Sequence, residues 1–145
     1  MIVENRRARF EYLILESFEA GLVLTGTEVK SMRAGGVSLS EAYARIRDGE
    51  AWLLGMHIPP YKQGSFSNAE PNRPRKLLLH KEEIARLQSR VGEKGLTIVP
   101  LRLYFTRGIA KVQLGVARGK KLWDKRADAA KRDVEREIAA HVRRS

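Results

Sequence analysis

Three parts of the chain carry apolar side chains at strand spacing. Residues 10–24 are dense in aromatic and branched side chains, which predicts a strand bent at Ala20-Gly21. In residues 39–58, two strand-like runs flank Asp48-Gly49, a pair typical of a two-residue hairpin turn. Residues 97–116 predict a second hairpin with a longer turn at 106–108. The alternating apolar positions are Ala42, Ala44 and Ile46 in the first hairpin and Leu101, Leu103, Phe105, Ala110, Val112, Leu114 and Val116 in the second.

Two short helices are expected between and beside these strands. Thr25 is followed three residues later by Glu28, the spacing of a capping box. This predicts a helix from Val29 to Arg33 that Gly35-Gly36 ends. Lys76–Leu79 leads into a second helix over residues 81–91, with Ile84, Leu87 and Val91 as its buried stripe.

Two segments differ from the rest in composition. Residues 62–75 hold Gly, Ser, Asn and two prolines, as expected of a long functional or mobile loop. After residue 119 almost no bulky apolar residue occurs, except one thin stripe that recurs every fourth position. We therefore expect a β-barrel domain over 1–119 and a basic tail over 120–145, disordered when free and helical on binding.

Several hairpin strands with two short helices predict a mainly β fold. A small antiparallel β-barrel of the oligonucleotide-binding type, with flanking helices, suits the length of 145 residues. The pattern alone leaves the barrel closed or partly open.

Composition adds a charge and excludes some chemistry. The chain has 28 Lys and Arg against 17 Asp and Glu, a net charge of +11, which favours nucleic acid or another polyanion as partner. It has no cysteine, so disulfide scaffolds, zinc ribbons and thiol chemistry are excluded. Without an apolar leader or a membrane-length apolar stretch, we expect a soluble, intracellular protein with no membrane partner.

Catalysis and metal binding find little support. His57, His80 and His141 are far apart in sequence, so surface or capping roles are expected for the first two and no metal site or cofactor is predicted. Residues 115–121 resemble a phosphate-binding loop, but the spacing is one short and Lys121 replaces the required Ser or Thr. A catalytic triad depends on geometry that sequence does not give. We expect that the protein is not an enzyme.

Basic residues flank the predicted barrel. Residues 5–9 precede the first strand, and Arg118, Lys120, Lys121, Lys125 and Arg126 follow the last one. Lys111 lies opposite in parity to Val112 and Leu114, hence on the polar face of its strand. On one barrel face these groups would form a phosphate-binding patch; the alternative for each is a solvated surface charge.

These motifs together resemble the family of SsrA-binding proteins, also called small protein B. The matching blocks, in order, are residues 5–8, 18–21, 26–35, 48–51, 75–79, 111–112, 115–121 and 124–126. The resemblance implies an oligonucleotide-binding-like barrel that binds the tRNA-like domain of transfer-messenger RNA near its D-loop. It further implies delivery of that RNA, with a translation elongation factor held through the RNA, to stalled ribosomes in the cytoplasm, for trans-translation. We expect a monomer.

The resemblance places RNA contacts on Glu28, Leu78 and Lys111 with neighbouring basic residues. The full predicted RNA-binding set is Asn5, Arg6, Arg7, Glu28, Lys30, Lys76, Leu78, Lys111, Arg118, Lys120 and Lys121. It also implies that the tail enters the decoding region and mRNA channel of the ribosome. The predicted ribosome-contacting residues are Trp123, Asp124, Lys125, Arg126, Ile138 and Val142.

Each of these assignments has an alternative interpretation. Glu28 could serve only as the capping partner of Thr25, or cap with one oxygen while the other faces RNA. Leu78 stands in an apolar triplet typical of a core, whereas the resemblance favours an exposed contact. Trp123 could stack on a ribosomal base. For the whole chain, the alternatives are a general RNA-binding module, such as a ribosomal protein or RNA chaperone, and an RNA-processing enzyme.

Overall fold

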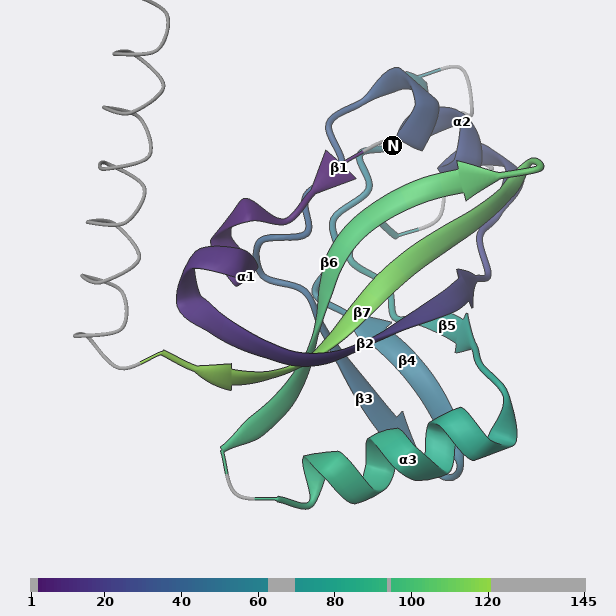
Figure 1. The fold of residues 1–145 in the computed structure, drawn as a ribbon. Helices are drawn as coiled ribbons and strands as arrows, with labels where there is room; N and C mark the ends of the chain where they lie inside the picture. The colour runs from purple at the N-terminus through teal and green to yellow at the C-terminus, as the bar shows by residue number, and fades with distance from the viewer. Residues whose placement is uncertain (1–2, 63–69, 94, 121–145) are drawn as a thin grey trace, which may run out of the picture.

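Seven antiparallel strands pair in the order β1–β6–β3–β4–β5–β2–β7, and a further pairing of β6 with β7 closes them into a ring. The computed structural model describes residues 3–62, 70–93 and 95–120 (Figure 1). The strands are β1 (Val3–Glu4), β2 (Tyr12–Leu22), β3 (Tyr43–Arg47), β4 (Glu50–Leu54), β5 (Arg75–Leu78), β6 (Leu96–Thr106) and β7 (Ile109–Gly119). The helices are α1 (Arg6–Glu11), α2 (Gly26–Ala34) and α3 (Lys81–Val91). The predicted mainly β fold with short flanking helices is confirmed.

Both predicted hairpins form, and both have two-residue turns. Asp48 and Gly49 adopt φ angles of 53° and 75° between β3 and β4. Between β6 and β7, Arg107 and Gly108 adopt 52° and 77°, and Thr106 pairs directly with Ile109. The prediction of a longer second turn is therefore wrong. Two consecutive left-handed residues match the twist of the flanking strands, and Arg107 accepts this conformation although it is not a glycine.

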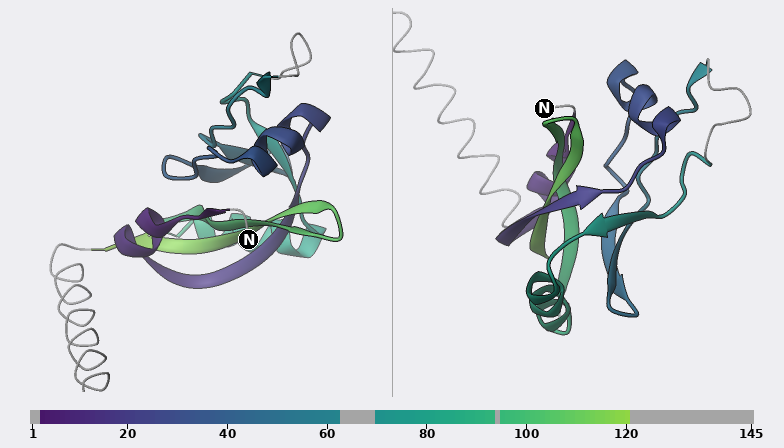
Figure 2. Two further views of the ribbon diagram at one scale, coloured as in Figure 1. Left: turned by 90° about the horizontal axis from the view of Figure 1, so that it is seen from above. Right: turned by 90° about the vertical axis from the view of Figure 1, so that its right-hand side faces the viewer.

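The capping box at the start of α2 is confirmed. The Glu28 N–H donates to the Thr25 hydroxyl, and the Thr25 N–H donates to the Glu28 carboxylate at 2.9 Å. Gly35, with φ of 99°, ends the helix. Helix α2 lies at one end of the ring and α3 at the other (Figure 2).

Helix α3 has the predicted bounds but a narrower buried face. Leu87 is fully buried and Ile84 half-buried, whereas Val91 is 41% exposed. Val91 faces an open groove between α3 and β3, so the predicted stripe is wrong at this position. His80 occupies the N-cap of α3, and its N–H donates to Glu83 at 3.1 Å.

Three elements differ from the sequence-based expectation. The basic segment after Asn5 forms helix α1, so the first long strand begins at Tyr12 rather than at residue 10. The sequence predicts a bend of this strand at Ala20-Gly21, whereas the shift in its register with β7 lies between Ile14 and Glu16. Residues 75–78, expected to lead into a helix, form β5 between β4 and β2. A four-residue run is too short for its pattern to show a strand.

The interior of the ring is filled by the inward side chains of these strands. Val112, Leu114 and Val116 on β7 are fully buried, as predicted. A smaller apolar cluster lies between α1 and the sheet, where Ala8 of α1 packs with Val99 of β6. The other large buried apolar residues include Met32, Leu39, Leu53, Met56, Leu77, Leu87, Ile98, Leu101 and Leu103.

Candidate nucleic-acid interface

One row of paired residues crosses four neighbouring strands on the outer face of the ring. Lys111 on β7 pairs with Tyr104 on β6 and with Gly21 on β2, and Gly21 pairs with Leu78 on β5. Directly paired residues point to the same face of a sheet. Because the next residues along two of these strands, Val112 and Leu77, are buried in the core, the row faces outward. The sequence-predicted contacts Leu78 and Lys111 therefore share one surface.

Leu78 is exposed although it stands in an apolar triplet. Its exposed fraction is 54%, which confirms the exposed position and excludes a core role. The side chain lies across Gly21, where an added Cβ would be 3.3 Å from the Leu78 Cβ. Glycine at position 21 thus allows Leu78 to lie close to the strand.

Two further apolar side chains lie near this row and were missed in the sequence. Val23, just past the end of β2, is 44% exposed, and Ile109, two residues before Lys111, is 55% exposed. The signal for Ile109 was its parity, opposite to that of buried Ala110 and Val112. We call Val23, Leu78 and Ile109 the apolar platform.

Lys111 belongs to a small polar cluster beside the platform. Its Nζ lies 3.9 Å from Oε1 of Glu19, and the Tyr104 hydroxyl donates to Oε2 of the same carboxylate. Partial burial, together with this hydrogen bond to Glu19, raises the pKa of Tyr104 above its ordinary value. The Lys111 side chain is 28% exposed and the Glu19 side chain 56%. A partly exposed pair at this distance is weak, so a phosphate can compete with Glu19 for Lys111.

Glu28 is buried, and both of its carboxylate oxygens are occupied. Oε1 accepts from the Thr25 N–H and from Arg73, while Oε2 accepts from Arg73 Nε at 3.1 Å and from Arg75 Nε at 2.9 Å. The capping role of Glu28 is therefore confirmed, and its second oxygen accepts from two arginines. Burial alone would raise the pKa of Glu28, but the hydrogen bonds from Arg73, Thr25 and Arg75 outweigh it and hold the pKa below its ordinary value.

Arg75 is a buried cation that the sequence did not reveal. Its side chain has no exposed surface. Besides Glu28, its guanidinium donates to the Met56 carbonyl at 2.6 Å and to the Pro71 carbonyl at 2.9 Å. Burial lowers the pKa of Arg75 despite the opposing effect of Glu28. Arg75 and Glu28 thereby join the start of β5 to helix α2, three residues before Leu78.

The Asn5 side chain is buried, and both its amide nitrogen and its amide oxygen are hydrogen-bonded. Its side-chain nitrogen donates to the Leu39 carbonyl at 3.2 Å and to the Pro100 carbonyl at 2.8 Å. Its side-chain oxygen accepts from the Ala8 N–H and caps α1. Only 5% of the residue is exposed. The amide therefore holds α1 against the ring, and the RNA contact expected of Asn5 stays a prediction.

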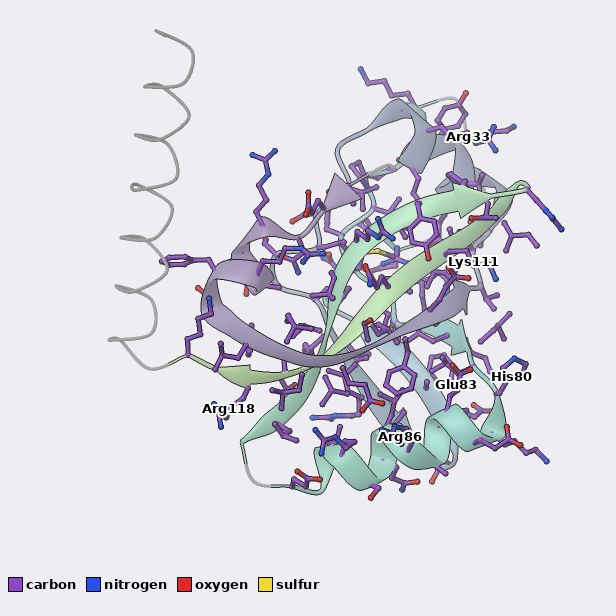
Figure 3. The ribbon with its side chains drawn as sticks, in the orientation of Figure 1. Arg33, His80, Glu83, Arg86, Lys111 and Arg118 are labelled. Atoms are coloured by element: carbon purple, nitrogen blue, oxygen red, sulfur yellow. The ribbon has the colours of Figure 1, made fainter. Side chains whose placement is uncertain are left out.

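The described cations among the predicted set lie at separate places on the surface. Figure 3 shows Lys111 and Arg118 at opposite ends of β7. Arg118 is exposed near Lys120, whose Nζ donates to the Arg9 carbonyl at 3.3 Å. Lys111 lies beside the apolar platform, whereas Arg118 and Lys120 lie where α1 meets the end of β7.

The remaining predicted cations are exposed or half-buried. Arg6 is exposed, and Arg7 forms ion pairs with Glu11 and Glu41. The other two are Lys30, whose Nζ lies 5.8 Å from the Tyr61 ring centre, and Lys76, whose Nζ lies 3.3 Å from Glu50. The predicted sites Lys121, Trp123, Asp124, Lys125, Arg126, Ile138 and Val142 lie outside the described residues.

The described residues hold neither a cluster of metal ligands nor a helix of membrane-spanning character. No group of three His, Cys, Asp or Glu side chains within residues 3–62, 70–93 and 95–120 could hold a metal ion. No helix in these same ranges combines the length and the apolar character needed to cross a membrane. His57 makes a 2.9 Å hydrogen bond with the Asn72 side chain, in keeping with the predicted surface role.

Comparison with known proteins gives consistent matches over nearly the whole chain. A family described as SmpB protein matches residues 2–144. An SsrA-binding protein of Desulforudis audaxviator is 60% identical over 142 residues, covering 98% of this chain and 93% of the relative. One from Carboxydothermus hydrogenoformans is 57% identical over 143 residues, covering 99% and 96%. A chain from the structure titled "tmRNA-SmpB: a journey to the center of the bacterial ribosome" is 58% identical with a TM-score of 0.70, covering 83% of this chain and 85% of that one.

Proposed function

Because the chain belongs to the SmpB family, we propose that it binds transfer-messenger RNA and delivers it to stalled ribosomes for trans-translation. In this role it acts in the cytoplasm as a monomeric adaptor with no chemistry of its own. The RNA carries the elongation factor, and the tail residues 120–145 engage the decoding centre and mRNA channel.

The observation that carries the RNA-binding proposal is the row that joins Leu78 to Lys111. It places a 54% exposed leucine on β5 and a lysine on β7 on one outward face, on either side of β2. An unstacked base of an RNA loop can pack on the apolar platform while Lys111 contacts a neighbouring phosphate. Such single-stranded loops are the parts of a folded RNA that proteins read most readily.

Within this proposal Glu28 is a positioning residue. Its carboxylate holds Arg73 and Arg75, and the Arg75 guanidinium fixes the carbonyls of Met56 and Pro71 at the entry to β5. Loss of Glu28 would disturb Leu78 through β5 without removing a direct RNA contact.

Competition between RNAs tests the proposal. The full chain, mixed with labelled transfer-messenger RNA and a large excess of ordinary tRNA, should retain the labelled RNA. Equal displacement by unrelated RNAs would instead support a general RNA-binding module. Cleavage of the labelled RNA by the pure protein would point to a processing enzyme.

A further inference from the structure

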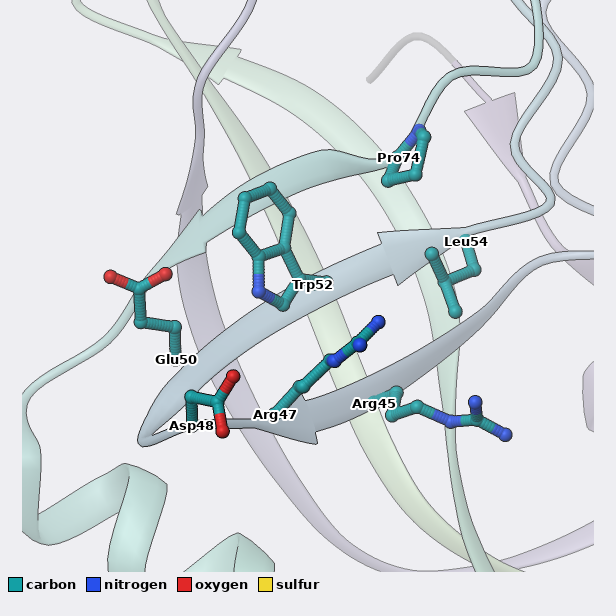
Figure 4. A pocket seen from close by; sticks show the side chains of 7 residues that line it. All are labelled: Arg45, Arg47, Asp48, Glu50, Trp52, Leu54 and Pro74. Carbon is teal, nitrogen blue, oxygen red and sulfur yellow. The ribbon is translucent and has the colours of Figure 1, made fainter.

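A groove of about 430 Å³ runs along the outer face of the β3–β4 hairpin. It is lined by Arg45, Arg47, Asp48, Glu50, Trp52, Leu54 and Pro74 (Figure 4). Trp52 pairs with Arg45 on β3 and with Lys76 on β5. Its neighbours Ala51 and Leu53 are buried, so the indole lies on the outer face.

The lining combines an apolar floor with cations at the rim. Half-buried Trp52 lies beside Leu54 and Pro74, and Figure 4 shows both arginines on the β3 side of the indole. Among the described residues, neither Arg45 nor Arg47 forms an ion pair. Two carboxylates also line the groove, but Glu50 is already paired with Lys76 at 3.3 Å. An aromatic floor with neighbouring arginines suits a nucleobase and its phosphate, because every base has a face that can stack.

The groove lies on the strand next to the one that carries Leu78 of the apolar platform. Lys76 and Leu78 lie two residues apart on β5 and therefore point to the same face. Because Lys76 pairs with Trp52, Leu78 is a diagonal neighbour of Trp52, at a typical separation of about 7–8 Å between Cα atoms. A strand of RNA that reaches Leu78 can continue over β5 to Trp52.

We propose that this groove binds an unpaired nucleotide of the same RNA that contacts the apolar platform. The base stacks on the Trp52 indole, and Arg47 and Arg45 contact the adjoining phosphates. The inference rests on the proposed function, since it extends the RNA footprint from β7, β2 and β5 onto β4 and β3.

Tryptophan fluorescence provides a direct test. The chain has two tryptophans, so in the full-length Trp123→Phe variant the signal comes from Trp52 alone. Titration with transfer-messenger RNA should quench this signal at the same concentrations at which anisotropy of the labelled RNA reports binding. RNA binding without any change in the Trp52 signal would overturn the proposal that the groove binds a nucleotide, and would leave the proposed function standing. Absence of RNA binding altogether would overturn both.

Substitutions give a second, independent measurement. Trp52→Ala should raise the Kd for the RNA about five-fold or more, and Trp52→Phe should restore most of the affinity because it keeps an aromatic face. Arg47→Gln should lower the magnitude of the salt slope by about 0.7. Arg86→Gln is the matched control, because it removes the same charge from the 62% exposed Arg86 side chain on α3. Unchanged affinity in the folded Trp52→Ala variant, or quenching by an apolar peptide but not by RNA, would contradict the assignment.

Discussion

Arg75 is completely buried, and its Nε donates a 2.9 Å hydrogen bond to the almost fully buried carboxylate of Glu28. The two residues are separated by 47 positions in sequence and connect α2 to the start of β5. Removing one partner of a buried ion pair leaves the other charge without compensation, which costs more than the pair itself contributes.

Glu28→Gln should therefore destabilise the fold by about 3 kcal/mol, although glutamine can still cap α2. Urea unfolding at neutral pH measures the difference. Glu93→Gln is the control, because Glu93 is 55% exposed and paired with Arg90 at the surface, where a loss of at most about 1 kcal/mol is expected. Wild-type stability combined with lost RNA affinity in Glu28→Gln would show that Glu28 contacts the RNA instead.

The same carboxylate predicts a dependence of stability on pH. Its pKa in the folded protein is held below the ordinary value of 4.5. Its contribution is therefore fully present above pH 4.5 and is lost as the pH falls through the folded-state pKa. Unfolding experiments between pH 7 and pH 3 should show this loss in the wild type and a shallower loss in Glu28→Gln. Parallel curves for the two proteins would contradict the prediction.

Lys111→Ala should weaken RNA binding and reduce the magnitude of the salt slope by about 0.7–0.9. The reason is the loss of one phosphate contact beside the platform. Binding measured across a series of salt concentrations gives the slope, with Arg86→Gln as the charge-matched control. An unchanged slope would identify Lys111 as an ordinary surface charge.

Glu19→Gln should strengthen RNA binding, whereas Lys111→Ala should weaken it. Glu19 lies 3.9 Å from Lys111 and would repel an approaching phosphate. Its neutralisation should tighten RNA binding several-fold at low salt, and the gain should shrink as salt screens the charges. Weaker binding in this variant would mean that Glu19 holds Lys111 in its binding position.

A chain that ends after Lys121 should keep RNA binding and lose ribosomal function. The apolar platform and Lys111 precede this point, whereas the predicted ribosome-contacting residues follow it. The expected result is a folded protein by circular dichroism that binds transfer-messenger RNA but does not support tagging on stalled ribosomes. Normal tagging by this truncation, or its failure to fold, would contradict the division into a 1–119 domain and a 120–145 tail.

Local features were predictable because their signals lie within a few residues. The Asp48-Gly49 turn and the Thr25–Glu28 capping box each depend on a short spacing, and both are confirmed. The alternation of Val112, Leu114 and Val116 likewise identified the buried face of β7.

Features that depend on distant partners were not predictable in this way. Asn5 stands at the start of a basic run in the sequence. In the structure its amide nitrogen donates hydrogen bonds to carbonyls 34 and 95 residues away. Arg75 stands in a segment with the composition of a loop, and only the approach of Glu28 makes its burial tolerable. For the RNA site, the resemblance indicated Leu78 and Lys111, while the register of β5, β2 and β7 was needed to place them in one row.

The pairing of β2 with β7 has a consequence for synthesis of the protein. Tyr12 pairs with Gly119, so β2, near the start of the chain, is joined to β7, the last of the described strands. A nascent chain leaving the ribosome cannot complete this sheet until residue 119 has emerged, and contacts of such long sequence separation form slowly. Until then β2 and β6 each lack the neighbour that β7 provides, and the Leu78–Lys111 row does not exist. The proposed RNA-binding surface is therefore assembled only after β7 has been made, which is the last strand within the described residues.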